Sequence, residues 1–130
     1  MYTGVVPCGV YVSGNYAYVA DNVYGLVILD ITELNNPILV EKVDLGWTGD
    51  GGRGLYVSGD YAYIADNDNG LVIVNIKDPS NPVEVGHLDT AGYAENVYVS
   101  GNYAFVADFS NGLVIVDVTD PSNPELVGGM

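Results

Sequence analysis

Positive charge is scarce in this sequence, whose 130 residues include only three basic side chains, Lys42, Arg53 and Lys77, against 17 acidic ones. The formal net charge of -14 at pH 7 repels the phosphates of nucleic acids and the surface of anionic membranes. We therefore expect neither as a partner. We interpret the charge as a well-solvated acidic surface, with attraction of cations or of a basic partner as the alternative.

Cysteine and histidine are equally rare. The single cysteine, Cys8, excludes a disulfide within the chain, and the single histidine, His87, leaves no Cys/His cluster for a transition metal. No Gly-rich strand-to-helix motif is available to hold a phosphate. We expect no catalytic residue, no metal and no cofactor, although carboxylates that meet across a pore would revive a hydrolase or lyase.

Long apolar runs and a targeting pattern are also missing. No run approaches the ~18 apolar residues that a membrane-spanning helix needs. Residues 1–7 lack the basic start and apolar core of a signal peptide. We expect no membrane span, and the compartment stays open.

Repetition is what the sequence has in abundance. Successive copies of every motif lie 45 and then 42 residues apart. The recurring motifs are Tyr-Val-Ser-Gly at 11–14, 56–59 and 98–101, an Asn-Pro pair at 36–37, 81–82 and 123–124, and an apolar run opened by Gly and closed by Asp or Asn at 25–30, 70–75 and 112–117. We assign one unit, 1–130, with repeats at approximately 2–46, 47–88 and 89–130.

Each repeat predicts four short strands. In the second copy we expect strands at 54–58, 61–66, 71–76 and 83–89, separated by turns rich in Gly, Asn, Asp and Pro. Four antiparallel strands in about 42 residues are typical of one blade of a β-propeller.

The apolar run Leu71-Val72-Ile73-Val74 does not alternate with polar residues, which indicates a strand buried on both faces. A propeller blade meets this condition because a neighbour covers each of its faces. Helical repeats of similar period would need a helical pattern, which is absent. A two-sheet sandwich tolerates a polar outer face, which these runs do not provide. The sequence therefore predicts an all-β propeller with three blades per chain.

The motifs Gly-Leu-Val-Ile-Val-Asn at 70–75, Tyr-Val-Ser-Gly and Asp-Pro-Ser-Asn-Pro resemble the LVIVD-repeat family of β-propellers, over nearly the whole chain. Copy one departs from the motif by Leu29 in place of Val and by its 32–37 loop. The resemblance implies a propeller repeat found mainly in bacterial and archaeal proteins, often extracellular or on the cell surface. It implies no general activity and no fixed catalytic residues.

Three blades are too few to close a ring, since propellers have typically 4–8. Because the three repeats fill the chain in phase, we expect two chains to form one six-bladed ring, as a homodimer with head-to-tail contacts. A piece of a longer propeller is the alternative.

Residues that recur in every copy are best explained by the scaffold. We expect the carboxylates at 21, 66 and 108 to accept hydrogen bonds from turn N–H groups, and the side chains at 30, 75 and 117 to do the same. The loop 66–70 has the look of a calcium loop, but it lacks a distal Glu and the other copies lose the pattern. The tyrosines at 11, 56 and 98, and at 16, 61 and 103, are expected to pack between blades.

Function is more readily sought where the copies disagree, because the scaffold does not dictate those positions. Cys8, Arg53 and Glu95 are equivalent by spacing yet chemically unrelated, and we expect all of them in loops between blades. The predicted binding rim is Tyr24, Trp47, Asp50, Arg53, Tyr93, Glu95 and Phe109. We predict a non-catalytic scaffold that binds a protein or small molecule there. The alternative is a purely structural, engineered or minimal half-propeller without a ligand.

Overall fold

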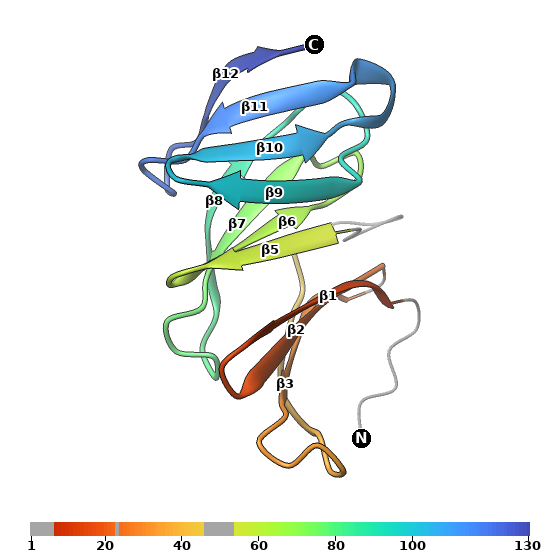
Figure 1. The fold of residues 1–130 in the computed structure, drawn as a ribbon, viewed down its shortest axis with the longest axis vertical. Coiled ribbons are helices and arrows are strands. Elements are labelled where there is room, and N and C mark those ends of the chain that lie inside the picture. The colour runs from red at the N-terminus through yellow and green to blue at the C-terminus, as the bar shows by residue number, and fades with distance from the viewer. Residues whose placement is uncertain (1–6, 23, 46–53) are drawn as a thin grey trace.

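The computed structural model describes residues 7–22, 24–45 and 54–130 of the chain (Figure 1). These residues form three four-stranded antiparallel sheets, which we call blades 1, 2 and 3. Blade 1 holds β1 (Pro7–Ser13), β2 (Tyr16–Asp21), β3 (Gly25–Asp30) and β4 (Ile38–Val43). Blade 2 holds β5 (Gly54–Ser58), β6 (Tyr61–Ala65), β7 (Leu71–Asn75) and β8 (Val83–Leu88). Blade 3 holds β9 (Asn96–Ser100), β10 (Tyr103–Ala107), the 3₁₀ turn η1 (Phe109–Asn111), β11 (Leu113–Asp117) and β12 (Glu125–Gly129).

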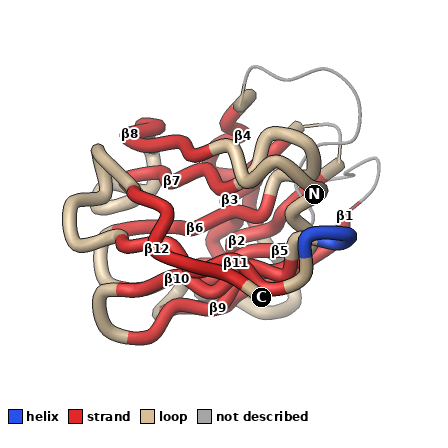
Figure 2. The backbone as a smooth tube through the Cα atoms, turned by 90° about the horizontal axis from the view of Figure 1, so that it is seen from above, coloured by secondary structure: helices blue, strands red, loops and turns tan. Residues whose placement is uncertain are grey.

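In each blade the strands follow one another in chain order, from a first strand to an outer strand. The blades are stacked along the long axis of the molecule, with blade 1 at the bottom of Figure 1 and blade 3 at the top. Contacts between blades concentrate on the first strands, because β5 touches both β1 and β9. The loops gather at the two ends of the strands (Figure 2). This is the all-β, propeller-like arrangement that the repeats predict.

The third strand of the central blade is buried on both faces, as its unbroken apolar run predicts. Leu71, Val72, Ile73 and Val74 are all 0% exposed. Val72 and Val74 pack into a core shared with blade 1, whereas Leu71 and Ile73 pack into a second core shared with blade 3. Each fully buried side chain of this size contributes about 1.5–3 kcal/mol through the hydrophobic effect. The two cores therefore hold the three blades together.

The predicted strands of the second repeat all exist and begin at the expected residues, and the last three end one residue earlier than predicted. One expectation about the first repeat is wrong. Cys8 lies inside β1 and not in a loop, because β1 starts at Pro7 and a register shift between Pro7 and Gly9 absorbs the extra residue.

The glycine that opens the apolar motif is required by a close approach of two strands. Gly70 has φ of +81°, and a Cβ there would overlap the carbonyl oxygen of Leu88 at the end of β8. Gly112 has φ of +73°, and a Cβ there would overlap the carbonyl oxygen of Met130 in the same way. The glycine thus lets the third strand begin directly against the end of the outer strand of its own blade.

We predict that Gly70→Ala destabilises the chain far more than Gly59→Ala. Both glycines have positive φ, which costs an alanine ~1–2 kcal/mol, but a Cβ at Gly59 meets nothing within 4 Å. At Gly70 the overlap with backbone adds ~1–3 kcal/mol. Urea unfolding followed by circular dichroism measures both losses. Equal losses of stability in the two variants would show that the backbone around position 70 moves aside for a Cβ at no cost in free energy.

Candidate functional site

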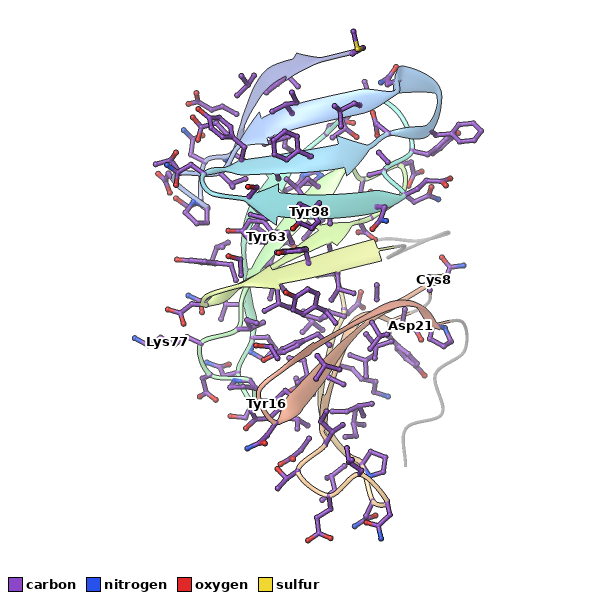
Figure 3. All side chains as sticks on the ribbon, in the orientation of Figure 1. Cys8, Tyr16, Asp21, Tyr63, Lys77 and Tyr98 are labelled. Carbon is purple, nitrogen blue, oxygen red and sulfur yellow. The ribbon has the colours of Figure 1, made fainter. Side chains whose placement is uncertain are left out.

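The loops between β2 and β3, β6 and β7, and β10 and β11 lie at one end of the blades, together with the segment 89–95 that links blade 2 to blade 3. We call this end the aspartate rim, because each of its strand ends carries a fully buried aspartate, Asp21, Asp66 or Asp108. Figure 3 shows Asp21 and Cys8 at this end of the strands and Tyr16 and Lys77 at the opposite end.

The three aspartates bind their turns in different ways. The backbone N–H of Tyr24 donates to Asp21 Oδ1 at 3.0 Å, as predicted. Asp108 accepts instead from side chains, with Thr90 Oγ1 at 2.6 Å from its Oδ1 and Asn111 Nδ2 at 3.1 Å from its Oδ2. The bond from Thr90 ties the segment after blade 2 to the turn of blade 3, and the bond from Asn111 closes that turn, so together they fix the position of the rim loops.

Asp66 is less well satisfied than its counterpart Asp108. Its Oδ2 accepts from Asn69 Nδ2 at 3.2 Å, but its buried Oδ1 has no hydrogen-bond partner. Burial raises the pKa of the Asp66 carboxyl, and the carboxylates of Asp68 and Glu84 raise it further, against the hydrogen bond from Asn69 and the proximity of His87. The ionised form of Asp66 therefore costs the folded chain free energy.

At the opposite end of the strands, the residues that close the apolar motif form tight side-chain turns, as predicted. The backbone N–H groups of Thr32, Lys77 and Thr119 donate to the side-chain oxygens of Asp30, Asn75 and Asp117, at 2.8, 2.9 and 2.8 Å. The side-chain and backbone hydrogen bonds from the neighbouring threonine lower the pKa of Asp30 and of Asp117. These residues therefore stabilise loops, and Asn75 of blade 2 accepts the equivalent backbone hydrogen bond without carrying a charge.

The repeated tyrosines of the first strands pack between blades, which confirms the structural interpretation. The ring centroid of Tyr56 lies 5.0 Å from that of Tyr11 and 4.7 Å from that of Tyr98. A side-chain hydrogen bond with Tyr56 raises the pKa of the Tyr98 hydroxyl, with smaller effects from the charge of Tyr56 and from burial. The row crosses all three blades and ends at Tyr98, which is largely exposed.

Two of the predicted rim residues, Tyr93 and Phe109, meet on the aspartate rim. Their ring centroids are 6.2 Å apart with the planes tilted by 59°, and both side chains are exposed. A backbone bridge beside Tyr93 holds it in place. Ala94, the next residue in the chain, exchanges backbone hydrogen bonds of 2.9 and 2.8 Å with Asn67. Exposed aromatic side chains on loops fixed in this way are typical of binding surfaces.

A hollow of about 320 Å³ lies beside Tyr93. It is lined by Asp68, Asp89, Ala91, Gly92 and Tyr93, so two carboxylates and one aromatic ring surround it. Asp89 also accepts a hydrogen bond of 2.8 Å from the backbone N–H of Ala91. The hollow therefore offers negative charge and a ring face to a ligand.

The other predicted rim residues are distributed differently. Tyr24 lies on blade 1 under the ammonium group of Lys42, with Nζ 4.3 Å from the ring centroid. Glu95 is exposed, and its backbone N–H donates to Ala107 O at 2.8 Å. Trp47, Asp50 and Arg53 lie outside the described residues. The predicted binding set did not include Asp68 or Asp89. Asp68 lies in a loop that the sequence already places on this rim, and Asp89 lies in the linker two residues before Ala91, which were the available signals.

Two reactive side chains stand apart from the hollow. His87 lies in the outer strand β8, as predicted, and its Nε2 is hydrogen-bonded to the carbonyl oxygen of Asn69. Cys8 is exposed on blade 1 and forms no disulfide. Within residues 7–22, 24–45 and 54–130, no three His, Cys, Asp or Glu side chains are grouped to hold a metal ion. What the described rim offers is hydrogen bonding, charge and aromatic contact.

Comparison with known proteins now defines the class and the family. The chain is a repeat protein with a propeller-like fold, one four-stranded blade per repeat. The LVIVD repeat model matches it three times, at residues 7–45, 51–90 and 91–130, so the chain belongs to the LVIVD repeat family. No curated protein matches the chain.

Two solved structures share the fold. The computationally designed Ika4 protein matches with a TM-score of 0.77 and 12% identity over 100% of this chain and 74% of its own. The computationally designed Ika8 protein matches with a TM-score of 0.72 and 14% identity over 95% of this chain, which spans only 36% of Ika8. At these identities the likeness concerns the fold alone. Among the described residues, no helix is long and apolar enough to cross a membrane.

We predict that Asp66 makes the chain less stable as the pH rises. Because its folded pKa is raised, the folded state binds the proton more tightly than the unfolded state, so stability falls as pH rises from the ordinary value of 3.8 through the raised one. Urea unfolding at several pH values should show this component in the wild type and in Asp108→Asn but not in Asp66→Asn. An unchanged pH profile in Asp66→Asn would contradict it.

Proposed function

We propose that the chain is a non-catalytic binding scaffold that closes its propeller ring by pairing with a second copy. The observation that carries this proposal is the unequal burial of one repeated leucine. Leu26 and Leu71 are 0% exposed, whereas Leu113, at the same position of blade 3, is 40% exposed. The face that blades 1 and 2 turn toward the next blade is covered, and the corresponding face of blade 3 is open.

The opposite face of blade 1 is open along its first strand, β1. Val12 is 57% exposed, although its counterparts Val57 and Val99 are 6% and 5% exposed. Val10 beside it is 64% exposed. Val19 and Val27, farther into the same sheet, are buried. The edge of this face thus presents valines that the other two blades bury against a neighbour.

The two open faces repeat the chemistry of a junction already made within the chain. Between blades 2 and 3, Tyr63, Leu71 and Ile73 pack against the valines of β9 to β11. Phe105, Leu113 and Ile115 stand at the corresponding positions of blade 3, ready to receive β1 and β2 of another copy. Two copies in head-to-tail contact supply six blades, which falls within the usual 4–8 of a closed propeller.

Ligand binding is proposed for the aspartate rim. The hollow beside Tyr93 combines the carboxylates of Asp68 and Asp89 with an aromatic ring, and the chain carries a net charge of -14. A cationic group would gain from both, through charge pairing and through contact with the ring face. The ligand class that this favours is a basic side chain of a partner protein or an organic amine.

Two other functions remain to be separated from this one. A purely structural half-propeller would pair with its copy and bind nothing on the rim. An enzyme would need carboxylates that act across the pore, and an activity abolished by a chelator or by their substitution would favour it. The rim hollow is the specific observation that favours the binding scaffold.

The first test is the mass of the chain in solution. We expect light scattering during gel filtration to give twice the chain mass of 13.8 kDa, because closing the ring buries the open faces of blades 1 and 3. Dilution should shift the population toward single chains. A stable 13.8 kDa monomer at all concentrations would overturn the proposed ring.

The second test is a fluorescence titration of the rim with a lysine-rich peptide. We expect Tyr93→Ser and Asp68→Asn each to weaken binding several-fold while the dimer mass stays the same, because both side chains line the hollow. Asp60→Asn is the matched control, since it removes the same charge from the turn after β5, at the opposite end of the blade. Equal losses in Asp68→Asn and Asp60→Asn would mean diffuse attraction without a site.

A further inference from the structure

Gly86, in the outer strand β8 of blade 2, packs directly against the loop between β11 and β12 of blade 3. Gly86 is buried in β8, and a Cβ added to it would overlap the carbonyl oxygen of Pro121 and lie 3.3 Å from Cδ of Pro124. Both prolines belong to the loop between β11 and β12. We call this glycine position on an outer strand the loop seat, because the loop of the next blade rests on it without room for a side chain.

Blade 3 has the same seat, and within the described chain nothing rests on it. The strand registers pair Gly86 with Ile73 and Gly128 with Ile115, so the two glycines are equivalent. A Cβ at Gly128 would meet nothing within 4 Å, and its φ is not in the left-handed region. Glycine weakens a strand interior. No contact within the described chain therefore explains a glycine at 128.

Blade 1 carries a loop of the same form that rests on no outer strand of its own chain. In this loop the backbone N–H of Asn36 donates to Glu33 O at 3.0 Å, as Asn123 N–H donates to Asp120 O at 2.9 Å in blade 3. Leu34 stands where Pro121 stands in blade 3, and it is 83% exposed. Within its described residues, the chain thus has one glycine seat on which no loop of its own rests, and one loop, that of blade 1, that rests on no outer strand of its own.

We propose that the Leu34 loop of one copy rests on Gly128 of a second copy, as the Pro121 loop rests on Gly86 within the chain. This inference depends on the proposed self-association and names the contact that fixes its direction, from blade 3 to blade 1. The junction between blades 1 and 2 lacks the seat, because the position paired with Ile28 is Glu41. Pro82 of blade 2 is accordingly less buried than Pro124. The glycine seat marks only the blade 2 to blade 3 junction and the junction between copies.

Substituting the two glycines separates the seats. We expect Gly128→Val to leave the chain folded, because its side chain meets nothing within the chain and valine suits a strand. It should raise the dissociation constant of the dimer about a hundredfold or more, because both junctions of the ring become overpacked. Gly86→Val is the matched control: it should destabilise each chain, because the clash there is with its own Pro121 loop.

The direction of the contact is tested from the loop side. Leu34→Asp changes a side chain that is 83% exposed in the chain, so the fold should survive while the dimer weakens. An equimolar mixture of the Gly128→Val and Leu34→Asp chains should then recover dimers. In a mixed dimer one junction combines both substitutions and the other is entirely wild type. Gel filtration with light scattering, and circular dichroism for the fold, measure all of this.

Each result decides the matter. A wild-type monomer would overturn the ring and the seat together. A wild-type dimer that both variants leave intact would overturn the seat alone and keep the ring. Loss of the dimer in Gly128→Val but not in Leu34→Asp would indicate contact of blade 3 with blade 3. Failure of the mixture to recover dimers would likewise overturn the head-to-tail contact.

Discussion

The structure depends on the burial of β7 between two other sheets. All four apolar residues of this strand are removed from water, two by blade 1 and two by blade 3. No single sheet achieves this, because one face of a blade always needs a neighbour. The repeat, the stacking of the blades and the tyrosine row on the first strands all follow from it. So does the glycine at 70, which brings the start of β7 against the end of β8.

The same constraint leaves the ends of the stack unsatisfied. Sequence repetition gives β11 the apolar run of β7, yet Leu113 and Ile115 have no blade in front of them in this chain. Identical side chains are thus a core in one blade and an open face in another. Burial differs because of position in the stack and not because of composition. An open face of this chemistry is most stable against another blade, and the proposed self-association rests on this.

Much of the fold could be predicted because periodicity determines it. The spacing of Tyr-Val-Ser-Gly and of the Asn-Pro pairs located the turns, and the unbroken run at 71–74 required cover on both faces. The binding rim was less predictable, since loop positions do not reveal which side chains meet. Tyr93 and Phe109 come together only because the bridge between Asn67 and Ala94 brings the linker to the turn. Cys8 was misplaced because a bulge in β1 breaks the spacing.

Departures from the repeat carry the information that the repeat itself cannot. Asp66 and Asp108 hold the same position, but only Asp108 has both oxygens satisfied, so burial alone does not give the two carboxylates one role. One position of the outer strand is Glu41 in blade 1 but glycine in blade 2 (Gly86) and blade 3 (Gly128). Only the two glycines leave room for a loop of the next blade. With three equal blades, the contact between copies would be the same as each contact within the chain. In the proposed assembly, the residues that break the equality set the direction of the contact between copies, and they lie on outer strands.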